Sequence, residues 1–286
     1  MGSFLSRILG LDPIKEADGE GYEPSSFSRM LAIDSKTDYK PVDFGKKYTG
    51  NKKILVICTE EKYMTMENGK KFASGNHPVE TCQPVMHLVN AGFAFDVATP
   101  TGKPAALELW ALPTKDNVFL EFFNTQKAKF NQPLSLADIV KSSSAKEEYV
   151  AVFAPGGQGA MLGLPEDPSM AAMIKHVKEK DLYFMSVCHG PAVLLAVKDK
   201  PHPYQGYKIA CFPDAIDKQT PMLGYLPGVQ TWYFGEKLTA DCGITIVNTG
   251  ADATFVADRK LLTGASPKAC QELGKVAAEK LLEEFA

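Results

Sequence analysis

The fold is decided by residues 182–195, which run LYFMSVCHGPAVLL. The first half is an apolar, β-favouring run, typical of a strand buried on both faces, and residues 191–197 follow a helical pattern. Cys188 lies at the junction, so we expect a sharp turn from a strand into a helix. Gly190 permits the tight path, and Pro191 suits a first helical turn because its missing N–H would be unpaired there anyway.

Cys188 on such a turn is a candidate nucleophile. A residue at a nucleophile elbow projects at the top of the sheet, beside the first free backbone N–H groups of the following helix. Those groups favour the thiolate, so we expect a lowered pKa and a sulfur that reacts at neutral pH. The alternative is that Cys188 is a small buried apolar residue, as most free cysteines are.

Outward from this turn, strand-like and helix-like segments alternate. Short apolar runs occur at residues 54–58, 93–98, 149–154, 207–211 and 244–247. Helical patterns occur at residues 80–90, 168–180 and 267–285. Alternation of this kind predicts an α/β fold, a sandwich with a mainly parallel sheet and helices on both faces. In such folds the reactive groups gather at the carboxyl ends of the strands.

Length and composition narrow the class of protein. A chain of 286 residues with 45% hydrophobic residues forms one large core, and a net charge of −3 gives no field for nucleic acid. The six cysteines show no CxxC pair and no metal spacing, which favours reduced thiols and a cytoplasmic location. The first residues lack a long apolar stretch, so we expect no signal peptide and no membrane span. Residues 1–6 do match the short M-G-x-x-x-S pattern of myristoylation.

Two regions depart from the alternating pattern. Residues 1–48 mix polar residues with glycine and proline, so we expect an extended N-terminal arm lying over a core that spans residues 49–286. Within the core, residues 102–144 predict an inserted cap whose aromatic side chains shield the active site. A solvated insertion with its own small core is the alternative. The aromatic residues in question are Trp110, Phe119, Phe122 and Phe123.

A second glycine-rich turn, residues 155–160, directly follows the apolar run at 149–154. Glycines at such a place let the backbone approach a ligand and point N–H groups at a developing oxyanion, which makes Gly156 and Gly157 candidate substrate-binding residues. A phosphate-binding loop is the competing interpretation, but the turn has neither the P-loop ending nor the dinucleotide spacing. Glu80 opens the helix at 80–90, where a carboxylate is ordinarily a solvated capping residue.

These blocks, together with residues 212–221 and 232–236, resemble the ThiJ/PfpI superfamily and, within it, the heat-shock-protein-31 branch of chaperones and glutathione-independent glyoxalases III. The similarity runs from about Tyr39 to the C-terminus. It implies a flavodoxin-like sandwich with a small cap domain, and a homodimer.

The resemblance also assigns roles to particular residues. Cys188 matches the family nucleophile, His189 its neighbouring histidine, and Glu80 the carboxyl group that contacts the cysteine. Asp217 matches the acid proposed to complete a Cys-His-Asp triad, although adjacent residues such as Cys188 and His189 rarely face one another well enough to act as nucleophile and base. Gly156 and Gly157 match the oxyanion turn.

The sequence departs from the branch at two places. Its best-known members bind a metal through two histidines and a glutamate, but the matching residues here are Val89, Ala94 and Gln126. Valine and alanine cannot ligate, so no metal site is expected and no cofactor is predicted. Gln158 replaces a histidine found in the oxyanion turn of some relatives, which leaves the substrate preference open.

The resulting hypothesis is a glyoxalase III that converts methylglyoxal, a small reactive dicarbonyl, to D-lactate through Cys188. Hydrolysis of glycated amines or thiols, a deglycase reaction, is the nearest alternative, and an aminopeptidase-like activity is a weaker one. A holding chaperone that binds unfolded proteins on an exposed apolar surface is the non-enzymatic alternative.

Overall fold

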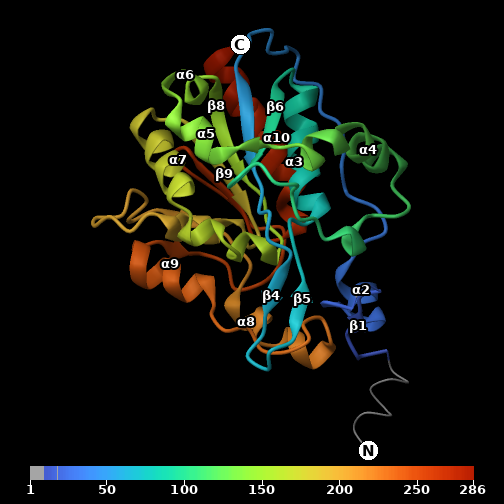
Figure 1. Cartoon of the computed structure of the whole chain (residues 1–286). Helices are drawn as coiled ribbons and strands as arrows, with labels where there is room; N and C mark the ends of the chain where they lie inside the picture. The colour runs from blue at the N-terminus through green and yellow to red at the C-terminus, as the bar shows by residue number, and fades with distance from the viewer. Residues whose placement is uncertain (1–9, 18) are drawn as a thin grey trace, which may run out of the picture.

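The computed structural model describes residues 10–17 and 19–286, so the myristoylation pattern at residues 1–6 lies outside the described residues. Its central sheet has seven strands in the order β12-β13-β9-β8-β3-β6-β7 (Figure 1). All neighbours run parallel except β12 and β13. The predicted α/β fold with a mainly parallel sheet is therefore confirmed. The strands are β3 (Lys53–Ile57), β6 (Ala94–Thr99), β7 (Leu134–Ser135), β8 (Tyr149–Ala154), β9 (Tyr183–Val187), β12 (Phe255–Asp258) and β13 (Leu261–Gly264).

Helices cover both faces of this sheet, as Figure 1 shows. One face carries α3 (Pro78–Asn90), α4 (Asn117–Asn131) and α10 (Cys270–Phe285), and the other carries α5 (Leu136–Lys141) and α7 (Pro168–Glu179). The remaining helices are α2 (Ser26–Ala32), α6 (Ser143–Lys146), α8 (Asp214–Asp217) and α9 (Phe234–Cys242). Short 3-10 helices are η1 (Leu109–Ala111), η2 (Gln158–Met161), η3 (Leu164–Glu166), η4 (Gly190–Ala196), η5 (Thr220–Leu223) and η6 (Pro267–Ala269).

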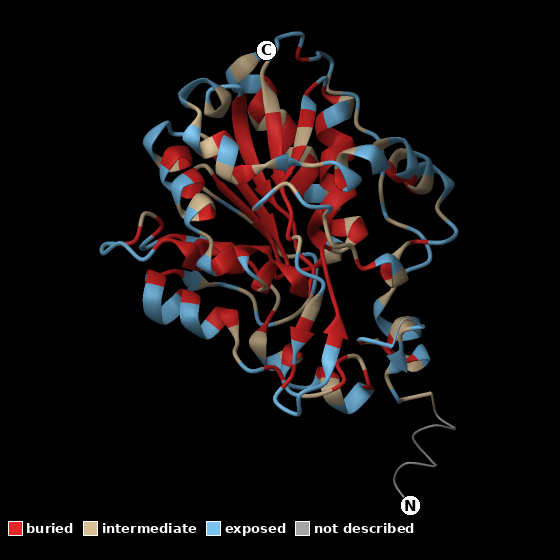
Figure 2. Cartoon of the chain, viewed as in Figure 1, coloured by how far each residue is buried: buried red, intermediate tan, exposed pale blue. Residues whose placement is uncertain are grey.

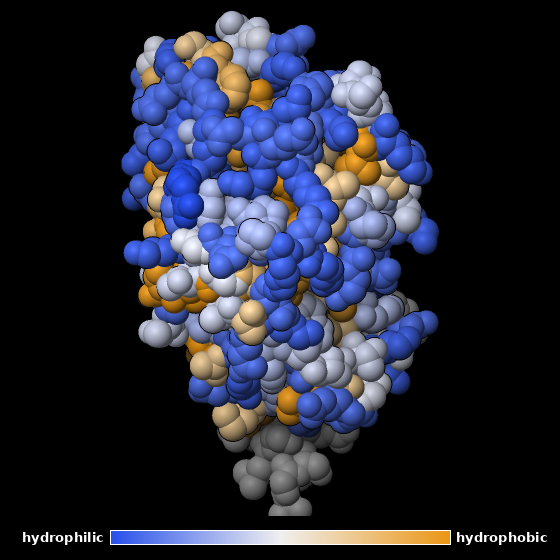
Figure 3. Space-filling view, turned by 90° about the vertical axis from the view of Figure 1, so that its left-hand side faces the viewer, coloured by the Kyte–Doolittle hydropathy of each residue, from blue (hydrophilic) through white to orange (hydrophobic). Residues whose placement is uncertain are grey.

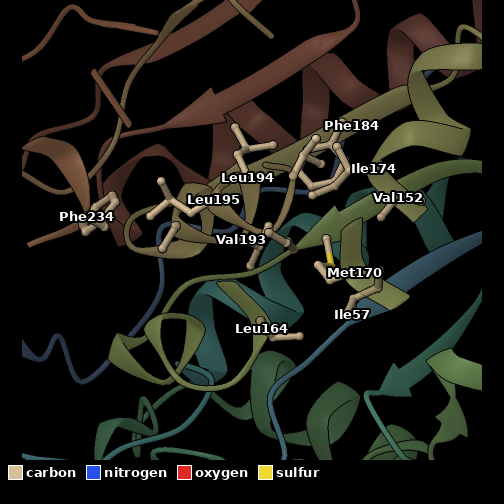
Figure 4. Packing of buried hydrophobic residues seen from close by; sticks show 14 of the residues in the cluster. Ile57, Val152, Leu164, Met170, Ile174, Phe184, Val193, Leu194, Leu195 and Phe234 are labelled. Atoms are coloured by element: carbon tan, nitrogen blue, oxygen red, sulfur yellow. The ribbon is translucent and has the colours of Figure 1, made fainter. Parts of the chain in front are cut away.

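The strand sequences explain why both faces are covered. Successive side chains of a strand point to opposite faces, so an unbroken apolar run must be buried on both. In β3, Ile54 and Val56 pack in the core on the α3 and α10 side, whereas Leu55 and Ile57 pack in the core on the α7 side. Figure 2 shows the inner strands of the sheet as buried, whereas the edge strands β7 and β12 are partly exposed. Figure 4 shows part of the core on the α7 side of the sheet. There, Ile57, Val152 and Phe184 from the strands meet Met170 and Ile174 of α7 and Val193, Leu194 and Leu195 of η4.

Two smaller sheets lie outside the central one. The first has the order β1-β2-β5-β4, from β1 (Ile14–Lys15), β2 (Tyr22–Glu23), β5 (Lys71–Ala73) and β4 (Tyr63–Thr65). The second pairs β10 (Lys208–Ile209) with β11 (Thr245–Ile246). The runs at 207–211 and 244–247 thus form strands, but in this separate pair. The central sheet instead includes the hairpin β12-β13, which turns at Arg259 with a φ of 56°. The sequence does not predict this hairpin, because no glycine, proline or asparagine marks its turn.

The two irregular regions hold more structure than their sequences indicate. The described part of the N-terminal region contains β1, β2 and α2, and residues 33–48 then run without regular structure past α3 and α10. Residues 102–144 contribute α4 to the core and β7 to the edge of the central sheet. Phe119 and Phe123 are buried and stack on each other rather than line the pocket around Cys188. Trp110 packs against Phe72 and Tyr225.

The outer surface over α7 and α9 faces the viewer in Figure 3. It is mainly hydrophilic, and its hydrophobic side chains are scattered in small spots. No helix within residues 10–17 and 19–286 is long and apolar enough to cross a bilayer.

The crossing of α3 and α10 generates a stability prediction. A Cβ atom at Gly274 of α10 would lie 2.7 Å from Pro84 Cα and 2.8 Å from His87 Cδ2. Gly274→Ala should therefore destabilise the chain by about 1–3 kcal/mol through overpacking, although alanine is the better helix former by about 1 kcal/mol. Urea unfolding followed by circular dichroism measures the effect. Lys280→Ala on the same helix is the control, expected within about 0.5 kcal/mol of wild type; equal or greater stability of Gly274→Ala would show that the helices can move apart freely.

Candidate active site

The site forms where the carboxyl ends of β8 and β9 meet the start of α3. Strand β8 leads into the turn at Gly156 and Gly157, β9 leads into Cys188, and α3 brings Glu80 against both. The approach is close, since a Cβ at Gly156 would lie 2.2 Å from Glu80 Oε2 and 2.8 Å from Cys188 Cβ. Only glycine fits at position 156. The structure brings together Glu80, Gly156, Gly157 and Cys188, which lie in three separate segments of the sequence.

The backbone at Cys188 takes the predicted sharp turn. Its φ is 57°, in the left-handed region that non-glycine residues seldom occupy. Two hydrogen bonds hold it there: the Cys188 N–H donates to Gly264 O at 2.8 Å, and the Phe212 N–H donates to Cys188 O at 3.0 Å. Strained backbone that neighbouring strands hold in place is common at functional sites. Here it directs the sulfur towards the start of α3.

The side chains of Cys188, His189 and Asp217 contact one another in that order. Cys188 Sγ lies 3.3 Å from His189 Nδ1, and His189 Nε2 lies 2.9 Å from Asp217 Oδ2. The expectation that neighbouring residues face one another poorly is wrong here, because the left-handed turn at Cys188 brings the two side chains together. Gln158 Nε2 donates to Asp217 Oδ1 at 3.4 Å and so supports the carboxylate from the glycine-rich turn.

Burial dominates the protonation of Glu80. Its side chain is 1% exposed, and desolvation raises its pKa to about 7, although contacts with the Cys188 thiol, His189 and the Gly157 N–H each lower it. Among the described residues, Glu80 Oε2 accepts no well-aligned hydrogen bond. A carboxyl group that titrates near neutrality, beside a sulfur, suits proton transfer.

The predicted lowering of the Cys188 pKa is wrong. Burial, followed by the negative charge of Glu80, raises the pKa of this thiol well above its ordinary value, although the His189 N–H opposes the rise. The depth of burial and the Glu80 carboxylate are the reason for the error, and η4, a seven-residue 3-10 helix, supplies little dipole to oppose them. Cys188 therefore rests as a thiol, and Glu80 is the group placed to take its proton.

The pKa of the neighbouring His189 is raised as well, but for a different reason. Burial alone would lower the pKa of His189, but the Asp217 carboxylate, by charge and hydrogen bond, raises it above its ordinary value. With Asp217 on Nε2, the Nδ1 atom of His189 faces the sulfur and can exchange a proton with it.

The sulfur opens into a pocket of about 200 Å³ with a mainly apolar wall. Sequence reasoning missed much of this wall. Glu108, from the irregular region 102–144, is 1% exposed and accepts a hydrogen bond from Ser74 Oγ at 3.2 Å, and its pKa is raised by burial and by Glu80. No motif surrounds Glu108, so no local signal could have found it. The apolar lining comes from Leu31, Ile33, Phe212, Ile216, Leu223 and Tyr225.

The other five cysteines lie outside this pocket. Cys58, Cys82, Cys211, Cys242 and Cys270 are all buried, and burial raises the pKa of each thiol. Within residues 10–17 and 19–286, no group of three or more His, Cys, Asp or Glu side chains could hold a metal ion. Val89, Ala94 and Gln126 do not fit the metal site of the branch, because only the last has a side chain with a donor atom.

Comparisons with known proteins show the family to which this fold belongs. The model of the DJ-1/PfpI family matches residues 71–280. The chain is 46% identical over 270 residues to proteins named protein/nucleic acid deglycase HchA from Escherichia coli O1:K1 and O157:H7, covering 94% of this chain and 95% of each relative. Glyoxalase III from Candida albicans shares the fold with a TM-score of 0.64 at 21% identity, over 82% of this chain and 98% of that one. A Francisella tularensis Rapid Encystment Protein does so with a TM-score of 0.67 at 19% identity, over 81% and 99%.

The raised pKa of Glu80 makes stability depend on pH. Between its ordinary value of 4.5 and about 7, the folded chain holds this proton more tightly than the unfolded chain, so Glu80 costs stability as pH rises through that window. Glu80→Gln removes the ionisation and should exceed wild type by up to about 3 kcal/mol at about pH 8, with the gain shrinking towards pH 4.5. Urea unfolding of both chains across this range measures the difference. A difference in the free energy of unfolding that does not change with pH would contradict an ionising Glu80 that is buried.

Proposed function

Because this chain belongs to the DJ-1/PfpI family, we propose that it is an enzyme that uses Cys188 to convert methylglyoxal to D-lactate without glutathione. The observation that supports this most is the position of the Cys188 sulfur, between a carboxyl group with a pKa of about 7 and a histidine held by Asp217. We further propose that it acts in the cytoplasm as a homodimer.

The first step joins the sulfur to the aldehyde carbon. As the S–C bond forms, the Cys188 proton passes to Glu80, and the carbonyl π electrons move to the aldehyde oxygen. The Gly157 N–H faces Glu80 and the His189 N–H faces the sulfur, so both border the space that this oxygen enters. Protonation of the oxygen gives a hemithioacetal on Cys188.

The next steps move hydrogen between the two carbons. A base, either Glu80 or His189, takes the proton from the carbon bonded to sulfur, and the electron pair forms an enediolate. Return of a proton to the neighbouring carbon leaves a lactate thioester. One carbon is thereby oxidised and the other reduced, so no external oxidant is needed. Water then attacks the thioester carbon, the C–S bond breaks, and lactate leaves while the Cys188 sulfur regains its proton.

A deglycase reaction is the second candidate, and the name of the 46% identical relatives favours it. It would use the same sulfur on a methylglyoxal adduct of an amine or thiol, and would end in the same thioester. The relatives are named for action on proteins and nucleic acids, so glycated groups on either are candidate substrates, even though a net charge of −3 gives no general affinity for a nucleic-acid backbone.

Replacement of the nucleophile tests the proposal. Cys188→Ala should abolish D-lactate formation from methylglyoxal, with no glutathione or metal added, and leave the circular dichroism spectrum unchanged, because only the attacking atom is lost. Cys242→Ala, at the end of α9 and outside the pocket, is the matched control and should keep activity near that of wild type.

Retained turnover in Cys188→Ala would rule out this mechanism. Suppression of the aggregation of an unfolded protein, measured on the same variant, separates a holding chaperone, whose action should survive the loss of the sulfur.

A further inference from the structure

Tyr225 adds a hydroxyl group to the mainly apolar wall of the Cys188 pocket. It follows η5 in the chain, and its backbone N–H donates to Thr220 O at 3.0 Å. The half-buried ring makes an edge-on contact with Trp110, with the ring centroids 5.8 Å apart, and a tilted contact with Phe72 at 5.9 Å. Two aromatic contacts and a backbone hydrogen bond therefore hold the phenol in one place.

The Tyr225 hydroxyl differs from the other hydroxyls of the pocket, because its proton is not engaged. Ser28 and Thr220 also line the pocket, but Ser28 Oγ donates to Leu223 O, and Thr220 Oγ1 donates to Asp217 O at 2.7 Å. The Tyr225 hydroxyl makes no hydrogen bond with residues 10–17 or 19–286, the part of the chain that the structure describes. A polar group that lines a pocket and has no protein partner is free to bind a ligand.

Acidic groups surround this phenol. Burial raises the pKa of Tyr225 well above its ordinary value, and the negative charges of Glu108, Cys188, Glu80 and Asp217 raise it further. Tyr225 therefore keeps its proton at neutral pH and can donate it in a hydrogen bond. Carboxylates repel an anionic oxygen, so a substrate oxygen that becomes negative in this pocket requires a donor such as the phenol.

The proposed reaction places negative charge on the two oxygens of methylglyoxal in turn. When the sulfur adds to the aldehyde carbon, the charge falls on the aldehyde oxygen, beside the N–H groups of Gly157 and His189. When the base then takes the C–H proton, the electron pair forms a C=C bond and the ketone π electrons move to the ketone oxygen. This second charge requires a donor of its own, because the two backbone N–H groups serve the other oxygen.

We propose that Tyr225 is a catalytic residue whose hydroxyl donates a hydrogen bond to the ketone oxygen of the bound dicarbonyl and stabilises the enediolate. This inference rests on the proposed chemistry of Cys188. It adds no covalent step, because the phenol keeps its proton throughout. The hydrogen bond strengthens as the oxygen gains charge, so it lowers the barrier to C–H cleavage more than it tightens the binding of substrate.

Tyr225→Phe tests the proposal, because it removes one oxygen atom and keeps the ring contacts. With methylglyoxal, kcat should fall about 100-fold, the usual effect of losing one donor to a developing oxyanion, while KM stays within about threefold of wild type. Iodoacetamide should alkylate the Cys188 sulfur within about twofold of the wild-type rate, because the thiol and its base stay in place. The Cys188→Ala chain provides the background for this alkylation rate.

Tyr204→Phe is the matched control. Tyr204 is buried outside the pocket, so loss of its hydroxyl should leave kcat and KM for methylglyoxal within about twofold of wild type. Tyr225→Met lacks the hydroxyl and fills the space with a flexible apolar side chain, so it should show the same loss of kcat and replaces Tyr225→Phe if that chain does not fold.

Two results would overturn the role of Tyr225. One is a kcat of Tyr225→Phe within about threefold of wild type. The other is an equal loss of kcat and of the alkylation rate, since the phenol would then only hold the sulfur in position. A wild-type chain that forms no D-lactate from methylglyoxal would instead overturn the proposed function.

Discussion

The site depends on one close contact, between the Cys188 sulfur and the Glu80 carboxyl group in a space that water scarcely reaches. Burial raises the pKa of both groups, and the negative charge of Glu80 raises that of the Cys188 thiol further, whereas the thiol lowers that of Glu80. At rest the proton of this pair lies on the sulfur, and Glu80 is the base beside it. In the proposed mechanism, Cys188 reacts because it has a base beside it, and it does not need to be a thiolate at rest.

The rest of the fold maintains that contact. The parallel strands β8 and β9 end side by side, so their two turns open at one edge of the sheet. Glycine at position 156 lets α3 approach closely enough for Glu80 to reach the sulfur. Asp217 and Gln158 hold His189 on the opposite side, and α2, from the N-terminal region, closes part of the pocket wall. Any substitution that moves one of these backbones should disturb the proton that the pair shares.

The sequence predicts the parallel sheet and the turn at Cys188 because both depend on local patterns: unbroken apolar runs, and a glycine and a proline just past the cysteine. Asp217 is 28 residues from His189, and no pattern joins them, so only the family resemblance brought it forward. Glu108 and α2 enter the site through tertiary packing, which leaves no periodic signal. The direction of the Cys188 pKa shift could not be predicted either, because it depends on how deeply the turn is buried and on a carboxylate from another segment.

Direct titration of the Cys188 thiol tests the central claim. Thiolate formation is followed by ultraviolet absorbance as pH rises, with the Cys188→Ala chain subtracted so that only this sulfur contributes. The account predicts a pKa well above that of a free cysteine in wild type, and a lower one in Glu80→Gln, where the neighbouring negative charge is removed. A thiol with an ordinary or lowered pKa in wild type, or one that Glu80→Gln leaves unchanged, would contradict it.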